Sequence, residues 1–290
     1  MENLLLETNF VLKKYGIKAN KSLGQNFLVD SEVINTIVDS SNITKDDVII
    51  EIGPGLGTLT KFLLEKAGKV ICIELDSRMV KILQDRFKLY KNFELCNEDV
   101  LKVDFQSIIQ KEKQSFKNVK VVANLPYYIT TPIIMKLLED KLQLKSITVM
   151  VQKEVAERLI AIPGEKEAGA ITYSVYYYAS SEKIVEVPKT SFVPEPKVDS
   201  EVIKLTLRNE APISVSNSKA MFQIIKYAFM QRRKTLLNSL TNAKIFSTKE
   251  QGEKILKELN LNENIRAERL TLQNFADITN KLSKKNIVKK

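Results

Sequence analysis

The sequence predicts an α/β protein in which helices cover a seven-stranded sheet and a smaller all-helical domain follows. Two observations support this class. From about residue 47 to residue 207, short β-rich runs alternate with helical patterns at intervals of roughly twenty residues, as in βα units of a parallel sheet. Beyond residue 208 the pattern is wholly helical. The chain has 290 residues, of which 44% are hydrophobic, so both domains can bury a real core.

The individual elements follow from hydrophobic periodicity. Ahead of the sheet, residues 4–15 and 32–38 repeat apolar side chains at helical spacing. The strand candidates are β-rich runs at 48–52, 70–74, 93–96, 119–123, 147–151, 183–187 and 201–207. Helices are expected between them at 59–66, 78–87, 132–138, 153–160 and 170–178.

A domain boundary is predicted at residues 209–218, which contain Pro212, three serines and no strong periodicity. The sheet domain would span 1–208 and the helical domain 209–290. Helices are expected in the second domain at 220–229, 234–240, 249–259 and 272–282.

Charge supports the same division. Residues 1–210 hold 29 basic and 29 acidic side chains, whereas residues 211–290 hold 16 basic and 6 acidic ones. The whole net charge of +10 therefore falls in residues 211–290, which favours a polyanionic partner.

Composition excludes several kinds of chemistry. The chain has no histidine, which removes histidine-dependent triads and His-ligated metal sites. Its two cysteines, Cys72 and Cys96, are too few for a disulfide framework or a four-thiolate zinc site, so we expect no metal. The N-terminus lacks the pattern of a signal peptide, and no segment approaches the roughly eighteen apolar residues of a membrane span. We expect a reduced, cytoplasmic and monomeric protein.

A glycine loop, GPGLG at 53–57, follows the first strand of the predicted sheet. Its glycines Gly53 and Gly55 permit a tight turn and a close approach of the backbone to a ligand. Glu74 ends the next strand, 21 residues after Gly53, where a carboxylate can accept both hydroxyls of a ribose. Asp99, after the third strand, is placed to meet an adenine. A tight turn with ordinary acids nearby is the alternative, but together these strand ends favour a nucleoside-type cofactor.

The fourth strand leads into NLPYYITTP at 124–132, at the same predicted sheet edge. Acceptors from Asn124 and the Leu125 carbonyl could bind both protons of an adenine's exocyclic amine. The glycine loop at 53–57 resembles the first motif of S-adenosylmethionine-dependent methyltransferases, which implies that the freed nitrogen lone pair could attack a sulfonium methyl group, without any histidine. Pro126 would shape the backbone between these acceptors and the aromatic residues that follow.

Aromatic side chains near this motif could hold the base. Tyr127 could stack on one face of the base, and Phe192, in a proline-bracketed loop, could close the other face. The alternative is that these rings fill the core. We expect that role for Tyr128 rather than for Tyr127, while Phe192 fits either.

Taken together, the motifs resemble the ribosomal RNA adenine dimethyltransferase family, and within it the KsgA-type branch. They are KSLGQNFL at 21–28, EIGPGLG at 51–57, ELD at 74–76, ED at 98–99, NLPYYITTP at 124–132, FVPEPKVDS at 192–200 and RRKTLLNSL at 232–240. The resemblance covers nearly the whole chain. It implies a Rossmann-like S-adenosylmethionine-dependent methyltransferase sheet. The implied activity is dimethylation of the N6 amines of two adjacent adenines, in a hairpin loop near the 3′ end of 16S rRNA, during small-subunit biogenesis.

The resemblance also implies a site. The cofactor would be held by Asn26, Leu28, Gly53, Gly55, Glu74, Asp99 and Asn124. Asn124 would border the target adenine as well. In the basic domain, Arg232, Arg233 and Lys234 are expected to contact the RNA backbone, although a solvated basic face without a partner is the alternative.

Two other functions remain open at this point. The related antibiotic-resistance branch methylates one adenine of 23S rRNA, but it usually shows NIPY in place of NLPYY and lacks the RKTLLNSL run. A non-catalytic ribosome assembly factor would keep the fold and have lost turnover. The intact cofactor and Asn124 motifs favour the enzyme.

Overall fold

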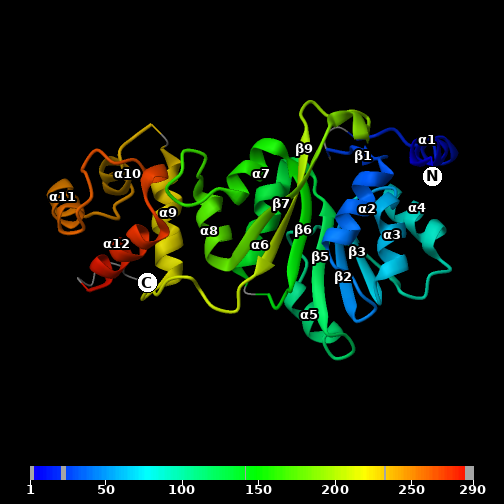
Figure 1. Cartoon of the computed structure of the whole chain (residues 1–290), viewed down its shortest axis with the longest axis horizontal. Helices are drawn as coiled ribbons and strands as arrows, with labels where there is room; N and C mark the ends of the chain where they lie inside the picture. Colours follow the sequence, from blue (N-terminus) through cyan, green and yellow to red (C-terminus); the bar gives the residue numbers. More distant parts are fainter. Residues whose placement is uncertain (1–2, 21–23, 141, 232, 285–290) are drawn as a thin grey trace. The chain divides into compact units, whose positions relative to one another are not determined.

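The structure is a computed structural model that describes residues 3–20, 24–140, 142–231 and 233–284 (Figure 1). Internal contacts divide the chain into two compact units. The sheet unit comprises Met1–Ala156 and Ser180–Leu207, and the helical unit comprises Glu157–Ala179 and Arg208–Lys290. The sheet unit ends at Leu207, and the segment 157–179 lies in the helical unit rather than with the sheet.

The reason for this difference is the packing of Tyr173. Its side chain is fully buried in the hydrophobic core of the helical unit, where its ring lies 5.1 Å from that of Phe275, centroid to centroid. Its hydroxyl donates to the carbonyl oxygens of Ala267 and Leu270, at 3.2 and 2.6 Å. Sequence periodicity identifies a buried face on a helix, but it does not show which core receives that face.

The sheet unit contains the predicted sheet of seven strands, in the order β4-β3-β2-β5-β6-β9-β7 (Figure 1). The strands are β2 (Asp47–Ile52), β3 (Lys69–Glu74), β4 (Phe93–Asn97), β5 (Asn118–Asn124), β6 (Ser146–Gln152), β7 (Ala179–Val187) and β9 (Ser200–Leu207). Strands β2 to β6 pair in parallel, and β9 pairs antiparallel with β6. The expected parallel sheet therefore ends at β6. Residues 188–199 connect β7 to β9. This connection contains no α-helix that could serve as the crossover which a parallel return usually needs.

Helices connect and flank these strands. They are α1 (Leu4–Lys14), α2 (Ser31–Ser40), α3 (Thr58–Lys66), α4 (Ser77–Phe87), α5 (Phe105–Glu112), α6 (Thr130–Glu139) and α7 (Lys153–Ile160). The sequence analysis missed α5, a helix of only 8 residues capped by the Asp104 side chain. It also missed a two-stranded antiparallel ribbon of β1 (Phe27–Leu28) and β8 (Phe192–Val193), which is too short to show periodicity.

The helical unit contains α8 (Ala170–Tyr178), α9 (Ser218–Met230), α10 (Leu236–Asn242), α11 (Lys249–Glu258) and α12 (Leu272–Lys284) (Figure 1). Its core includes the fully buried rings of Phe246 and Phe275. Among the described residues, no helix is long and apolar enough to cross a membrane.

Gly57, the last residue of the glycine loop, has no room for a side chain. Its φ is +82°, and a Cβ built there would lie 2.5 Å from Cε2 of Phe87 and 2.9 Å from Cδ2 of Leu83. We expect Gly57→Ala to lower the free energy of unfolding by about 2–4 kcal/mol, because overpacking adds to the backbone strain. Denaturant unfolding measures this loss.

Gly16 provides the matched control. Its φ is +61°, but nothing lies within 4 Å of a Cβ built there. Gly16→Ala therefore carries only the backbone strain, about 1 kcal/mol. Equal losses for the two variants would show that crowding by α4 contributes nothing at Gly57.

Candidate cofactor and substrate site

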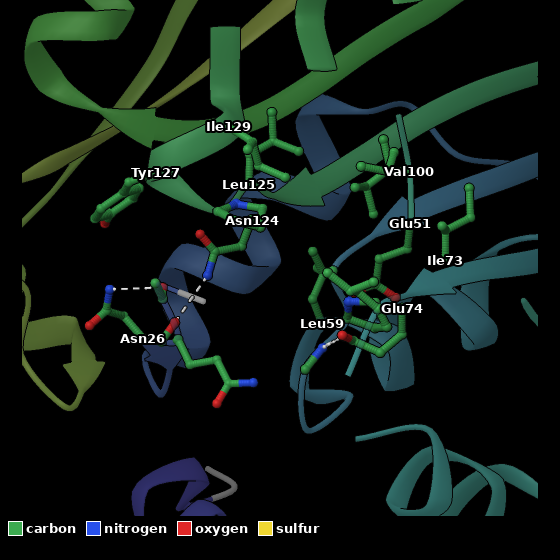
Figure 2. A pocket seen from close by; sticks show the side chains of 18 of the residues that line it. Asn26, Glu51, Leu59, Ile73, Glu74, Val100, Asn124, Leu125, Tyr127 and Ile129 are labelled. Carbon is green, nitrogen blue, oxygen red and sulfur yellow. Dashed lines mark hydrogen bonds between the residues drawn. The ribbon is translucent and has the colours of Figure 1, made fainter. Parts of the chain in front are cut away.

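A cavity of about 300 Å³ lies at the carboxyl ends of β2, β3, β4 and β5 in the sheet unit (Figure 2). Because these strands are parallel, the loops that follow them meet at one edge of the sheet. Ten of the predicted site residues line the cavity. They are Asn26, Leu28, Gly53, Gly55, Glu74, Asp99, Asn124, Leu125, Pro126 and Tyr127.

The glycine loop holds Glu74 in place. Gly53 and Gly55 have φ angles of +66° and +57°, in the left-handed region that favours glycine. The Gly55 N–H donates to Oε2 of Glu74 at 3.2 Å (Figure 2), and the Asp76 N–H donates to Oε1 at 2.8 Å. The Glu74 side chain is buried, and this burial raises the pKa of its carboxyl, while the two backbone donors act in the opposite direction.

Asp99 lies in the loop after β4. Its Oδ1 accepts the Leu101 N–H at 3.0 Å, which orients the side chain at the cavity wall. The apolar residues Leu75, Val100 and Leu101 line the same part of the cavity, and the sequence analysis did not select them. Two acids at successive strand ends, with apolar side chains between them, suit the polar edge and the flat faces of a nucleoside.

Glu51 is the site residue that sequence reasoning missed. It lies in β2 and is one of the residues that line the cavity, although it is only 2% exposed. The Thr60 hydroxyl donates to its Oε2 at 2.6 Å, and the Cys72 thiol lies 3.4 Å from the same oxygen. Burial raises the pKa of Glu51 to about 7. A single acid inside an otherwise apolar strand core, VIIEI, was the available signal.

Asn124, at the end of β5, is oriented by the chain segment before β1. Its Nδ2 donates to the Asn26 carbonyl at 3.3 Å, and Nδ2 of Asn26 donates to the Gly24 carbonyl at 3.2 Å (Figure 2). The Asn124 Oδ1 and the Leu125 carbonyl have no hydrogen-bond partner among the described residues. Two acceptors are thus left at the cavity wall, as an exocyclic amine requires.

The two tyrosines of the motif lie in the 3₁₀ helix η2 (Tyr127–Ile129). Tyr127 is half-buried, and its hydroxyl lies 2.6 Å from Oγ of Ser200, a hydrogen bond that anchors the ring. Tyr128 is 51% exposed and lines the cavity, so the expectation that it fills the core is wrong. The tight 3₁₀ turn directs neighbouring side chains to different sides, which an extended reading of the motif does not anticipate.

Phe192 is not brought to the cavity. It lies opposite Leu28 in the β1–β8 ribbon and is only 2% exposed, within the hydrophobic core of the sheet unit. Of its two predicted roles, stacking and burial, the structure therefore has burial.

The basic residues expected to bind RNA fall between α9 and α10 in the helical unit. Arg233 and Lys234 are exposed and form no ion pair with another described residue. Arg232 lies outside the described residues. The helix expected at 234–240 begins at Leu236, after the capping residue Thr235, so these cations precede it.

The described lining of the cavity fits S-adenosylmethionine. It contains four acids, Glu51, Glu74, Glu98 and Asp99, and no Lys or Arg, which suits a ligand with a positively charged sulfonium. A sheet with a glycine loop after β2 and acids at the ends of β3 and β4 defines a Rossmann-like methyltransferase, and S-adenosylmethionine is the methyl donor of this class.

Comparison of the sequence with known proteins identifies the family within this class of methyltransferases. The family described as ribosomal RNA adenine dimethylase matches residues 16–284. Ribosomal RNA small subunit methyltransferase A of Alkaliphilus oremlandii is 44% identical over 279 residues, which are 96% of this chain and 97% of that protein. The protein of the same name from Lachnoclostridium phytofermentans is 47% identical over 281 residues, again 96% and 97%. The chain belongs to the ribosomal RNA adenine dimethylase family.

Two solved structures have the same fold as this chain. A dimethyladenosine transferase from Plasmodium falciparum superposes with a TM-score of 0.73 at 28% identity, covering 90% of this chain and 98% of that one. The 23S rRNA methyltransferase ErmE shares the fold, with a TM-score of 0.65 at 23% identity over 89% of this chain and 100% of that one. The predicted fold class and family are confirmed, and the protein is an S-adenosylmethionine-dependent rRNA adenine dimethyltransferase.

Proposed function

We propose that the protein dimethylates N6 of two adjacent adenines in a hairpin loop near the 3′ end of 16S rRNA, acting in the cytoplasm on the small ribosomal subunit or its precursor. The observation that carries this proposal is the placement of Asn124, Leu125 and Tyr127 at the wall of the cofactor cavity. The relatives named small subunit methyltransferase A support the choice of subunit.

Each proposed contact with the cofactor is made by a residue that lines the cavity. S-adenosylmethionine supplies an electrophilic methyl group on its sulfonium. Glu74 accepts the ribose hydroxyls, Asp99 binds the adenine edge, and Gly53 leaves room for the methionine part. Asn26 and Leu28 cover the cofactor and exclude water.

The target adenine is held and activated by the motif after β5. The Asn124 Oδ1 and the Leu125 carbonyl accept the two amine protons, which draws the nitrogen toward a tetrahedral geometry and frees its lone pair. Pro126 sets the direction of the Leu125 carbonyl, and the Tyr127 ring stacks on the base. Stacking contributes roughly 1–3 kcal/mol per base, which offsets much of the cost of extruding the nucleotide.

A methylation assay tests the proposal. Purified protein, labelled cofactor and small subunits that lack these methyl groups are incubated together, and the modified positions are mapped by primer extension. We expect label in two adjacent adenines of the 16S hairpin. Binding without label would refute the enzyme in favour of an assembly factor, and label confined to 23S rRNA would support the antibiotic-resistance activity.

The helical unit is proposed to hold the RNA backbone. Replacing Arg232, Arg233 and Lys234 together by alanine should reduce the slope of log affinity against log salt by roughly 2–3. The reason is that each phosphate contact that is lost lowers the number of counterions released when RNA binds. Filter binding to small-subunit RNA at several salt concentrations measures the slope.

A triple replacement of Lys244, Lys254 and Lys257, all exposed in the same unit, removes the same charge and serves as the control. An equal change in slope for both triple variants would mean that only the net charge of the unit attracts RNA.

A further inference from the structure

The cofactor cavity contains a carboxyl group that its proposed contacts leave unused. Glu51 lies in β2, one strand away from Glu74 in β3, and both residues line the cavity (Figure 2). Glu74 accepts two backbone N–H groups, whereas the partners of Glu51 among the described residues are the Thr60 hydroxyl and the Cys72 thiol. Neither carboxyl group forms an ion pair with a described Lys or Arg.

Opposing effects on its pKa decide whether the Glu51 carboxyl is ionised. Removal from water penalises the carboxylate, and the nearby Glu74 also raises the pKa, which reaches about 7 although Thr60 and Cys72 lower it. On the other side, the stretch 121–123 of β5 carries no titratable side chain. A positive charge in the cavity would therefore favour the carboxylate, and its loss would favour the acid.

The cofactor and its product differ in the charge to which such a group responds. S-adenosylmethionine has a positive sulfonium, whereas S-adenosylhomocysteine has a neutral thioether and is otherwise the same except for the methyl group. We propose that Glu51 is a specificity residue that is ionised when the sulfonium cofactor occupies the cavity and protonated when the thioether product does. This inference rests on the proposed placement of the cofactor in this cavity.

The consequence concerns exchange of product for cofactor. Dimethylation of two adenines consumes four cofactor molecules, so the product must leave the same cavity four times. An anionic Glu51 strengthens binding of the cationic cofactor only. Once the methyl group has passed to the adenine nitrogen and the amine proton has passed to water, the carboxyl takes a proton from water, and this added attraction disappears. Glu51 therefore shifts the relative affinity toward the cofactor without contacting the target base.

Calorimetric titrations of both ligands test the inference. Between pH 6 and pH 8, we expect the affinity for S-adenosylmethionine to rise roughly five- to tenfold relative to that for S-adenosylhomocysteine, because proton loss from Glu51 is linked to sulfonium binding only. Both ligands carry an amino and a carboxyl group, so the ratio reduces the influence of their own titration. In Glu51→Gln, the ratio should not vary with pH. A wild-type pH dependence in that variant would overturn the proposal.

Two further variants sharpen the test. Thr60→Val keeps Glu51 but removes the hydroxyl that stabilises its carboxylate, so the midpoint of the ratio should move to higher pH. This measurement stands even if Glu51→Gln does not fold. Glu65→Gln removes an exposed acid of α3, the helix that carries Thr60, but lies outside the cavity lining and should leave the midpoint unchanged. An unmoved midpoint in Thr60→Val would contradict the role of Glu51.

Failure of this inference is distinguishable from failure of the proposed site. If Glu74→Ala changes the affinity of neither ligand, the cofactor is not bound in this cavity, and the proposed function loses its site. If Glu74→Ala weakens both ligands and the wild-type ratio stays flat with pH, only the role of Glu51 is refuted.

Discussion

Asn124→Ala is expected to slow methyl transfer by about 10²- to 10³-fold, the usual cost of losing one well-placed polar group that stabilises a transition state. The affinities for cofactor and RNA should stay within about threefold, because Asn124 contributes only one polar contact to either ligand. Single-turnover rates with labelled cofactor measure the first effect, and equilibrium binding measures the second.

Asn26→Ala is the matched control for this variant. It removes the same type of side chain beside Asn124 but keeps the Asn26 carbonyl that accepts the Asn124 Nδ2. Its loss should appear in cofactor affinity and not in the rate with saturating cofactor. Rapid turnover by Asn124→Ala would mean that the Leu125 carbonyl alone activates the amine.

Glu74→Ala is expected to weaken binding of S-adenosylmethionine by at least about 100-fold, because two hydrogen bonds to a charged acceptor are lost, each contributing about 1.5–3 kcal/mol. Calorimetry at one pH measures the change. Part of the loss would come from the glycine loop, since Glu74 also accepts the Gly55 N–H.

Two comparisons separate these contributions. Glu74→Gln retains an oxygen for the Gly55 N–H and should recover part of the affinity. Glu98→Ala, an exposed acid of the same cavity wall, should change affinity by less than about threefold, the effect of an exposed charge. Equal losses at Glu74 and Glu98 would indicate attraction by general negative charge rather than recognition of the ribose.

Much of the site was predictable because parallel strands bring their carboxyl ends together. Glu74 ends β3, Asp99 follows β4, and Asn124 ends β5, the next strand along the chain. Once the strands are recognised, the common edge follows from topology alone. The glycine loop was equally visible, since three glycines within five residues have few other uses at a strand-to-helix turn.

The errors share a different cause. Tyr128 is exposed because a short 3₁₀ helix turns it outward, and Phe192 is buried because a two-residue strand pairs it with Leu28. Neither element is long enough to have a periodic pattern. Glu51 was missed because a carboxyl's burial, and hence its raised pKa, depends on what packs around it.

The sequence by itself determined the seven-stranded α/β class, the family, the basic character of the C-terminal region and ten of the residues that line the cavity. These properties are encoded in local pattern, motif spacing and charge. Only the tertiary structure decided that residues 157–179 belong to the helical unit, that Asn124 is oriented by the Asn26 carbonyl, and that Glu51 lies buried at the cavity. Each of these facts depends on contacts between distant segments, whose energies come from packing and desolvation rather than from neighbours along the chain.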